Sequence, residues 1–226
     1  MALHTDRRYE EDLARLRQLV LGMGGLVERQ IDQAMRALTT SDRLLAERTI
    51  ERDHEVNRYD VEIDEECLRM LALHQPAARD LRLITTGLKI TTDLERIGDM
   101  AVNICERAID IGAEGQRLHG DLQQMAETVR KMLRECLDAF VREDADLALS
   151  VCKEDDAIDA LHSHLFDETL VSMTKNPSTV VLGTALLFVS KYLERIADHT
   201  TNIAEMVIFM VKGKSIRHLT VVPATI

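Results

Sequence analysis

The chain has 226 residues, a formal net charge of −11 and only 3% aromatic residues, while 46% of its residues are hydrophobic and 30% are charged. The negative charge argues against binding to nucleic acid, which needs a basic surface to displace counterions from phosphates. The lack of aromatic residues and the abundance of strong helix formers argue against a β-rich fold and predict an all-α protein.

The sequence carries no pattern typical of secretion or membrane insertion. Residues 1–11 are polar and lack the apolar core of a signal peptide. The most apolar run, residues 180–189, is about half as long as the roughly twenty residues that a membrane span requires. The four cysteines are widely spaced, which is typical of buried free thiols in a reducing compartment. We therefore expect a cytoplasmic protein with no direct membrane insertion.

Apolar residues at helical spacing predict six helices, over residues 7–39, 42–73, 77–111, 121–141, 144–173 and 178–211. Gly22, Gly24 and Gly25 interrupt the first pattern, where we expect a break or a close approach between helices. Pro76 and Pro177 end the second and the fifth, because the residue before proline disfavours the α conformation.

The sequence contains an internal repeat that groups these helices into two units. Residues 94–106, LERIGDMAVNICE, recur without a gap as residues 193–205, LERIADHTTNIAE, and the preceding helices also align. Long helices joined by short turns form antiparallel bundles. We therefore predict two tandem three-helix bundles, the first in residues 1–115 and the second, with a short C-terminal tail, in residues 116–226.

Each predicted bundle has two helices with oxygen-bearing residues spaced i, i+4. These candidate metal ligands are Asp53, Asn57, Glu95 and Asp99 in the first bundle and Asp155, Asp159, Glu194 and Asp198 in the second. Residues four apart are neighbours on a helix, so these carboxylates repel one another unless a cation lies between them. Oxygen ligands suit Mg, Mn, Ca or Fe, and Zn if His162 or His199 takes part.

Other interpretations of these residues remain open. The acidic stripes are also typical of the solvated faces of amphipathic helices. Arg96 and Arg195 are expected to form ion pairs with the acids beside them, and binding of a phosphate-like anion is the alternative. A ferritin-like carboxylate-bridged redox enzyme would need two E-x-x-H helices. Only Glu51 and His54 make that motif, and Asp156 stands at the position equivalent to His54.

Several motifs together resemble the PhoU family of bacterial phosphate-transport regulators. They are Met23-Gly24-Gly25-Leu26-Val27-Glu28, Asp53-x-x-Val56-Asn57, Gln75-Pro76-x-x-x-Asp80-Leu81-Arg82 and the twice-used Leu-Glu-Arg-Ile-x-Asp. The resemblance extends over residues 7–220, about the whole chain. Each motif is weak alone, but the set in this order is specific.

The resemblance implies a cytosolic, homodimeric, non-enzymatic protein with metal on its E/D-x-x-x-D motifs, iron or zinc first and magnesium or manganese also considered. It implies a negative regulator of the phosphate-starvation response. In that role the protein would act as an adaptor between the ATPase subunit of a phosphate ABC importer and a phosphate-sensing membrane histidine kinase. A ferritin-like redox enzyme and a metal-free helical adaptor are the alternatives.

The two predicted sites depart from each other. Asn57 stands where the second repeat has Asp159, so we expect a lower ligand charge at the first site. Ala197 replaces Gly98, a position expected to touch no ligand. The two sites are therefore expected to differ in metal affinity or identity.

Overall fold

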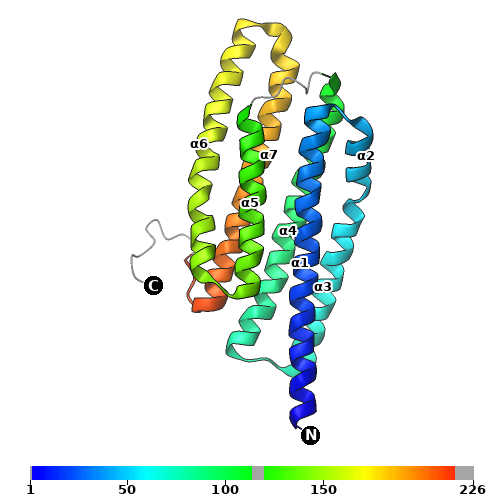
Figure 1. Cartoon of the computed structure of the whole chain (residues 1–226), viewed down its shortest axis with the longest axis vertical. Helices are drawn as coiled ribbons and strands as arrows, with labels where there is room; N and C mark the ends of the chain where they lie inside the picture. The colour runs from blue at the N-terminus through cyan, green and yellow to red at the C-terminus, as the bar shows by residue number, and fades with distance from the viewer. Residues whose placement is uncertain (1, 114–119, 217–226) are drawn as a thin grey trace.

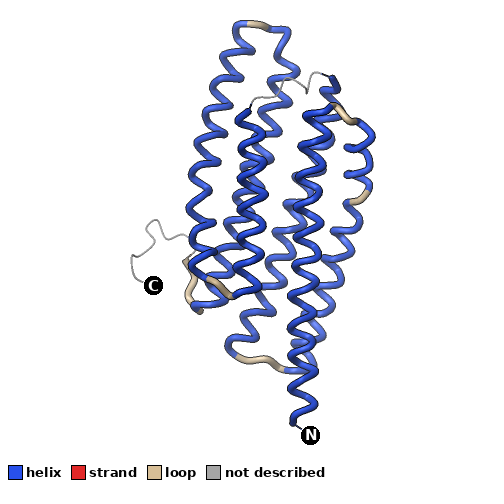
Figure 2. Tube along the Cα trace, viewed as in Figure 1, coloured by secondary structure: helices blue, strands red, loops and turns tan. Residues whose placement is uncertain are grey.

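The computed structural model describes residues 2–113 and 120–216, and every regular element in these ranges is a helix (Figure 2). The elements are α1 (Ala2–Thr40), α2 (Arg43–Glu51), α3 (Asp53–His74), α4 (Ala78–Ile111), α5 (Gly120–Arg142), α6 (Ala145–Lys175), the short 3-10 helix η2 (Pro177–Thr179) and α7 (Val180–Lys212). The all-α prediction is confirmed, and the prolines end α3 and α6 as expected.

Two predicted helices differ in the structure. α1 runs without a break through Gly22, Gly24 and Gly25, so the close approach occurs and the break does not. The predicted helix 42–73 is divided at Arg52 into α2 and α3. The backbone of Arg52 has φ −75° and ψ −4°, and its carbonyl accepts from the N–H of Glu55 at 2.9 Å. This tight turn redirects the chain between the two helices.

The turns before α2 and α6 are built alike, in agreement with the repeat. Ser41 and Glu143 both adopt a left-handed conformation, with φ of 55° and 54°. The next residues, Asp42 and Asp144, cap the following helices; Asp42 accepts from the backbone N–H of Leu45 at 3.0 Å. A side-chain oxygen in this place satisfies an N–H that the first turn leaves unpaired.

The two repeats pack into one body (Figure 1). In the first repeat α1, α3 and α4 pack together and α2 covers α1 and α4, while in the second α5, α6 and α7 pack together. α4 also packs along α7 and α1 along α5, and one continuous hydrophobic core runs through both repeats. The predicted domain boundary at residues 115/116 lies outside the described residues and stays a prediction.

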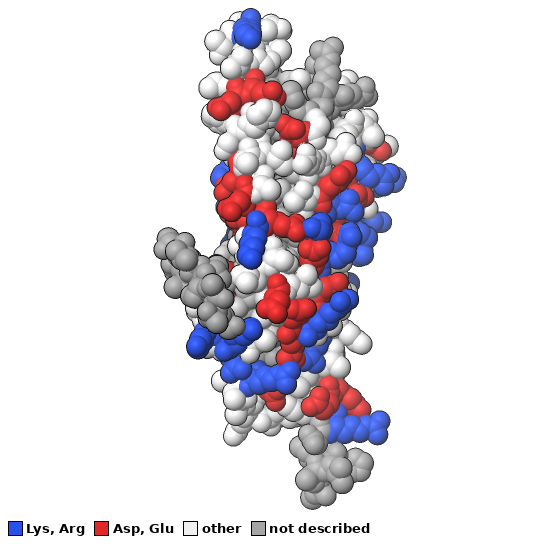
Figure 3. All heavy atoms as spheres, turned by 60° about the vertical axis from the view of Figure 1, so that its left-hand side comes forward, with Lys and Arg blue, Asp and Glu red and all other residues white. Residues whose placement is uncertain are grey.

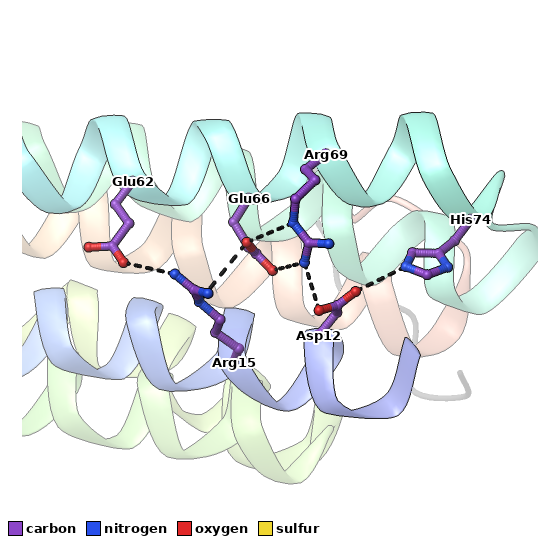
Figure 4. A network of polar contacts seen from close by, with 6 residues as sticks. All are labelled: Asp12, Arg15, Glu62, Glu66, Arg69 and His74. Carbon is purple, nitrogen blue, oxygen red and sulfur yellow. Dashed lines mark hydrogen bonds and ion pairs between the residues drawn. The ribbon is translucent and has the colours of Figure 1, made fainter. Parts of the chain in front are cut away.

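α3 is tied to α1 by a network of charged side chains (Figure 4). Arg69 Nη2 lies 2.7 Å from Asp12 Oδ1 and 2.5 Å from Glu66 Oε1, and His74 Nε2 lies 2.9 Å from Asp12 Oδ2. Hydrogen bonds from Arg69 and His74 hold the pKa of the Asp12 carboxyl below its usual value. Since the Asp12 and Glu66 side chains are 14% and 6% exposed, the network belongs to the packed interface.

The surface carries charges of both signs. On the face shown in Figure 3 the acidic side chains are interspersed with Lys and Arg. In the ranges that the structure describes, no helix combines the length and the apolar character needed to cross a bilayer.

Candidate metal centres

The predicted ligands of the first repeat face one another across the contact between α3 and α4. A Cβ atom on Gly98 of α4 would lie 3.5 Å from Asp53 Oδ1 of α3. Glu95 lies one turn before both Gly98 and Asp99, because residues three and four apart are neighbours on a helix. Asn57 donates through Nδ2 to Asp53 Oδ2 at 3.3 Å. The structure thus brings the α3 pair and the α4 pair to one place.

The acids of this first group perturb one another. Burial, followed by the charge of Asp99, raises the pKa of Glu95, and burial, followed by the charge of Asp53, raises the pKa of Asp99. Arg96 opposes both shifts: its Nε lies 3.5 Å from Glu95 Oε2 and its Nη1 3.7 Å from Asp99 Oδ2. The expected ion pairs of Arg96 are therefore present. The arginine side chain is 57% exposed, so solvent screens its charge and the acids still repel.

Gln30 of α1 is the residue that the sequence reasoning missed. It is 1% exposed, and its Nε2 donates to Asp53 Oδ1 at 3.3 Å. Its Oε1 is buried without a hydrogen-bond partner in the described structure. The available signal was a polar residue at a core position of a helix, beside the buried Val27 and Ile31.

Gly98 lies beside a predicted ligand, and the expectation that this position touches none of them was wrong. A Cβ atom there would lie 3.3 Å from Gln30 Oε1, in addition to its approach to Asp53. The glycine therefore leaves space for these two oxygens between α1, α3 and α4, a relation that depends on tertiary packing.

The predicted ligands of the second repeat also come together, between α6 and α7. Burial, followed by the charges of Asp198 and Asp159, raises the pKa of Asp155 to about 6. Asp156 and Glu194 add smaller effects of the same sign. A half-buried carboxyl among like charges is stabilised by a proton or by a cation.

A lysine offsets part of the charge in the second group. Lys191 donates through Nζ to Glu194 Oε1 at 2.6 Å, one turn before the acid. Burial, followed by the charge of Glu194, raises the pKa of Asp198, and Lys191 opposes this shift. Like Arg96, Lys191 is about half exposed and neutralises the acids incompletely.

The two histidines considered as zinc ligands engage other residues. His162 Nδ1 lies 3.1 Å from Ser190 Oγ. His199 Nδ1 lies 2.8 Å from Asp93 Oδ1 of α4 and so joins the two repeats. Both contacts use Nδ1, so a metal bound by either ring would take Nε2.

One compact group of potential ligands lies elsewhere. Among His, Cys, Asp and Glu in the described ranges, three ligand atoms approach within 4.8 Å of one another only at Asp121, His164 and Glu168. His164 Nδ1 lies 3.0 Å from Asp121 Oδ2 and Nε2 lies 3.7 Å from Glu168 Oε1. With both ring nitrogens beside carboxylates and the imidazole 60% exposed, this group is a surface ion-pair cluster.

The eight predicted ligands are thus paired across helix contacts without forming a closed three-carboxylate site. The donors present fit a hard cation: carboxylates whose charged forms are disfavoured, and at the first centre an unpartnered buried amide oxygen. Their role as metal ligands stays a prediction.

Comparisons with known proteins identify the family of the chain. A model of the PhoU domain matches residues 20–108 and 122–207. A Pseudomonas putida protein, named phosphate-specific transport system accessory protein PhoU homolog, is 42% identical over 218 residues, which are 96% of this chain and 85% of that protein. The Escherichia coli K12 protein named phosphate-specific transport system accessory protein PhoU is 36% identical over 217 residues, covering 96% of this chain and 90% of its own.

Solved structures agree with these relatives. The crystal structure of PhoU from Pseudomonas aeruginosa matches with a TM-score of 0.86 and 42% identity, over 91% of this chain and 100% of that one. The phosphate transport system regulatory protein PhoU from Streptococcus pneumoniae matches with a TM-score of 0.86 and 31% identity, over 92% of this chain and 99% of that one. From its two matching halves and its full-length relatives, the chain belongs to the PhoU family.

Proposed function

We propose that the chain is a non-enzymatic regulator of phosphate transport that binds a metal ion in each repeat. The observation that carries the metal part is the pairing of acids across α3–α4 and across α6–α7. Carboxyl pKa values are raised on α4 in the first repeat and on both α6 and α7 in the second. The names of the relatives, accessory proteins of a phosphate-specific transport system, support the assignment to phosphate transport.

In this proposal the acids provide the ligands and the bundle positions them. Asp53 and Asn57 are held on α3 against Glu95 and Asp99 on α4, and Asp155 and Asp159 on α6 against Glu194 and Asp198 on α7. A bound metal would supply the positive charge that Arg96 and Lys191 provide only in part. Binding would then stiffen the contact between the two helices of each pair.

The regulatory part of the proposal is an adaptor role. We propose that the chain acts in the cytoplasm as a homodimer that contacts the ATPase subunit of a phosphate ABC importer and a phosphate-sensing membrane histidine kinase. Binding of both would keep the phosphate-starvation response repressed while phosphate is plentiful. Long helices with mixed surface charge suit docking to folded partners, and the interspersed acids do not suit nucleic acid (Figure 3).

Metal content tests the site. Purified full-length chain should bind divalent metal, and Glu95→Ala/Asp99→Ala should lose about half of it while circular dichroism shows unchanged helix. Glu194→Ala/Asp198→Ala should lose the other half. Glu47→Ala/Glu51→Ala is the matched control, because it removes two exposed acids at the same spacing on α2. A wild type that takes up none of iron, zinc, manganese and magnesium contradicts the metal assignment.

Repression of alkaline phosphatase tests the adaptor role. A bacterial strain that lacks its own regulator should regain repression at high phosphate when it expresses the wild-type chain. If the double variants at both centres repress as well as the wild type, the protein is a metal-free helical adaptor. Oxygen-dependent turnover by the iron-loaded chain would instead favour the ferritin-like redox enzyme.

A further inference from the structure

A buried amide oxygen points to a difference between the two centres. Gln30 is 1% exposed, and its Oε1 has no hydrogen-bond partner among the described residues. An amide oxygen removed from water without a partner is destabilising, so such atoms are rare in folded proteins. We therefore expect Gln30 Oε1 to bind a ligand, and the residues around it indicate the chemistry of that ligand.

The orientation of the Gln30 amide is fixed by Asp53. Nε2 donates to Asp53 Oδ1 at 3.3 Å, and the opposite orientation would place two oxygens against each other. Oε1 therefore faces away from that bond, toward α4, where a Cβ on Gly98 would lie 3.3 Å from it. Glu95 lies one turn before Gly98 on the same face of α4, and Asp99 is the residue after Gly98. The bare oxygen is thus turned toward the carboxylates of the first centre.

The second repeat lacks this arrangement. Met132 occupies the position equivalent to Gln30, and Ala197 the position equivalent to Gly98. Met132 is fully buried and offers no oxygen, while the methyl group of Ala197 occupies the volume that Gly98 leaves open. Two coupled replacements thus remove both the amide oxygen and the space beside it.

We infer that the amide oxygen of Gln30 is a metal ligand of the first centre and has no counterpart in the second. The inference rests on the proposed metal binding. With Asn57, it gives the first centre two amide groups beside the carboxylates of Asp53, Glu95 and Asp99, whereas the second has four carboxylates. Amide and carboxylate oxygens together suit hard cations such as Mn²⁺ or Mg²⁺. The first centre therefore offers such an ion one more ligand residue than the second, with one carboxylate fewer.

Titration with Mn²⁺ tests the inference in the full-length chain. Glu194→Ala/Asp198→Ala serves as the parent, so that the first centre alone is measured by calorimetry or by the loss of the free Mn²⁺ spin signal. Gln30→Met, which installs the residue of the second repeat, should weaken Mn²⁺ binding by about ten- to a hundredfold, as loss of a ligand or of its support typically does. Gln30→Glu keeps an oxygen and should retain binding.

Gln33→Met, one turn along α1, is the matched control. Gln33 is half-buried and accepts from Thr49 Oγ1 at 3.3 Å, whereas Gln30 donates to Asp53, so the Gln33 variant should bind like the parent. Circular dichroism and thermal unfolding of the metal-free variants verify that each is folded. If folded Gln30→Met binds Mn²⁺ as tightly as the parent, Gln30 Oε1 is hydrogen-bonded to water and not to the metal. The inference is then wrong, while the proposed function stands. If the wild type binds no divalent metal, both are wrong.

Discussion

Leu137 of α5 occupies the space above Gly24 of α1. A Cβ atom on Gly24 would lie 2.3 Å from Leu137 Cδ1, closer than two non-bonded carbon atoms can approach. Leu137 is 6% exposed, so it cannot turn away without disturbing the core. This contact lies where the first repeat packs on the second, and the glycine allows the two helices to come close.

Gly24→Ala should therefore destabilise the protein relative to Gly25→Ala. Both substitutions gain the same helix propensity, but at Gly25 the nearest atom is the end of the flexible Arg29 side chain, 3.6 Å away. Overpacking against Leu137 should lower the free energy of unfolding of Gly24→Ala by about 1 to 3 kcal/mol below that of Gly25→Ala. Urea unfolding of both variants measures the difference, and equal midpoints would show that α1 and α5 adjust freely.

The fold could be predicted from the sequence because its signals are local. Apolar spacing, Pro76 and Pro177 determine where helices run and end, within a few residues of the chain. The continuity of α1 could not be predicted, since three glycines weaken a helix and only the packing of Leu137 on Gly24 shows what they do. The turn at Arg52 is likewise absent from the apolar pattern.

The candidate site likewise could be predicted only in part from the sequence. The acids spaced i, i+4 could be found because each pair lies on one helix, and the repeat related the two sets. Gln30 could not be assigned, because it joins Asp53 from a different helix, and its missing partner is visible only once α1, α3 and α4 are packed. Gly98 has no side chain, so the sequence gives no sign that it lies near the predicted ligands. Its position becomes visible only when Gln30 and Asp53 pack against it.

Removing Arg69 should destabilise the contact between α1 and α3. Arg69→Met keeps much of the apolar length but removes the guanidinium shared by Asp12 and Glu66 (Figure 4). Asp12 then keeps only His74, and Glu66 only Arg15 at 4.0 Å. Because both carboxylates are mostly buried, we expect the free energy of unfolding at pH 7 to fall by about 2 kcal/mol. Urea unfolding followed by circular dichroism measures the loss.

The pH dependence identifies the cause of that loss. The pKa of Asp12 is lowered in the folded protein, so its stabilising effect is present above its usual value of 3.8 and is lost as pH falls through the folded value. The gap between the wild type and Arg69→Met should therefore narrow below about pH 4. Arg7→Met, which removes an 80% exposed partner of Glu11, should change stability by less than about 0.5 kcal/mol. A gap that stays constant with pH would attribute the loss to packing alone.

The cysteines should react slowly with thiol reagents in the folded protein. All four are free thiols, with Cys67, Cys105 and Cys136 buried and Cys152 half-buried. Burial raises the pKa of Cys67, Cys105 and Cys152 to about 12, so almost no thiolate is present at pH 8. A colorimetric thiol assay should show slow release, with Cys152 first, and a rapid release of four equivalents in guanidinium. A fast equivalent in the native protein that a Cys152→Ser variant retains would contradict the burial of the other three.

Asp155→Asn should stabilise the metal-free protein at neutral pH. The pKa of Asp155 is raised to about 6 in the folded state by burial, then by Asp198, so the folded protein favours the protonated acid. The contribution of protonated Asp155 to stability is fully present below the pKa of this group in the unfolded chain, and it is lost as pH rises through about 6. With a chelator at pH 7.5, the free energy of unfolding of Asp155→Asn should therefore exceed that of the wild type by about 1 kcal/mol. The figure is modest because solvent screens a half-buried group, and at pH 4 there should be no gain.

Asp156→Asn, at the exposed neighbour, is the control and should change stability little at either pH. Thermal or urea unfolding at the two pH values measures the effect. A gain of equal size at both pH values would show that the titration of Asp155 is not its source.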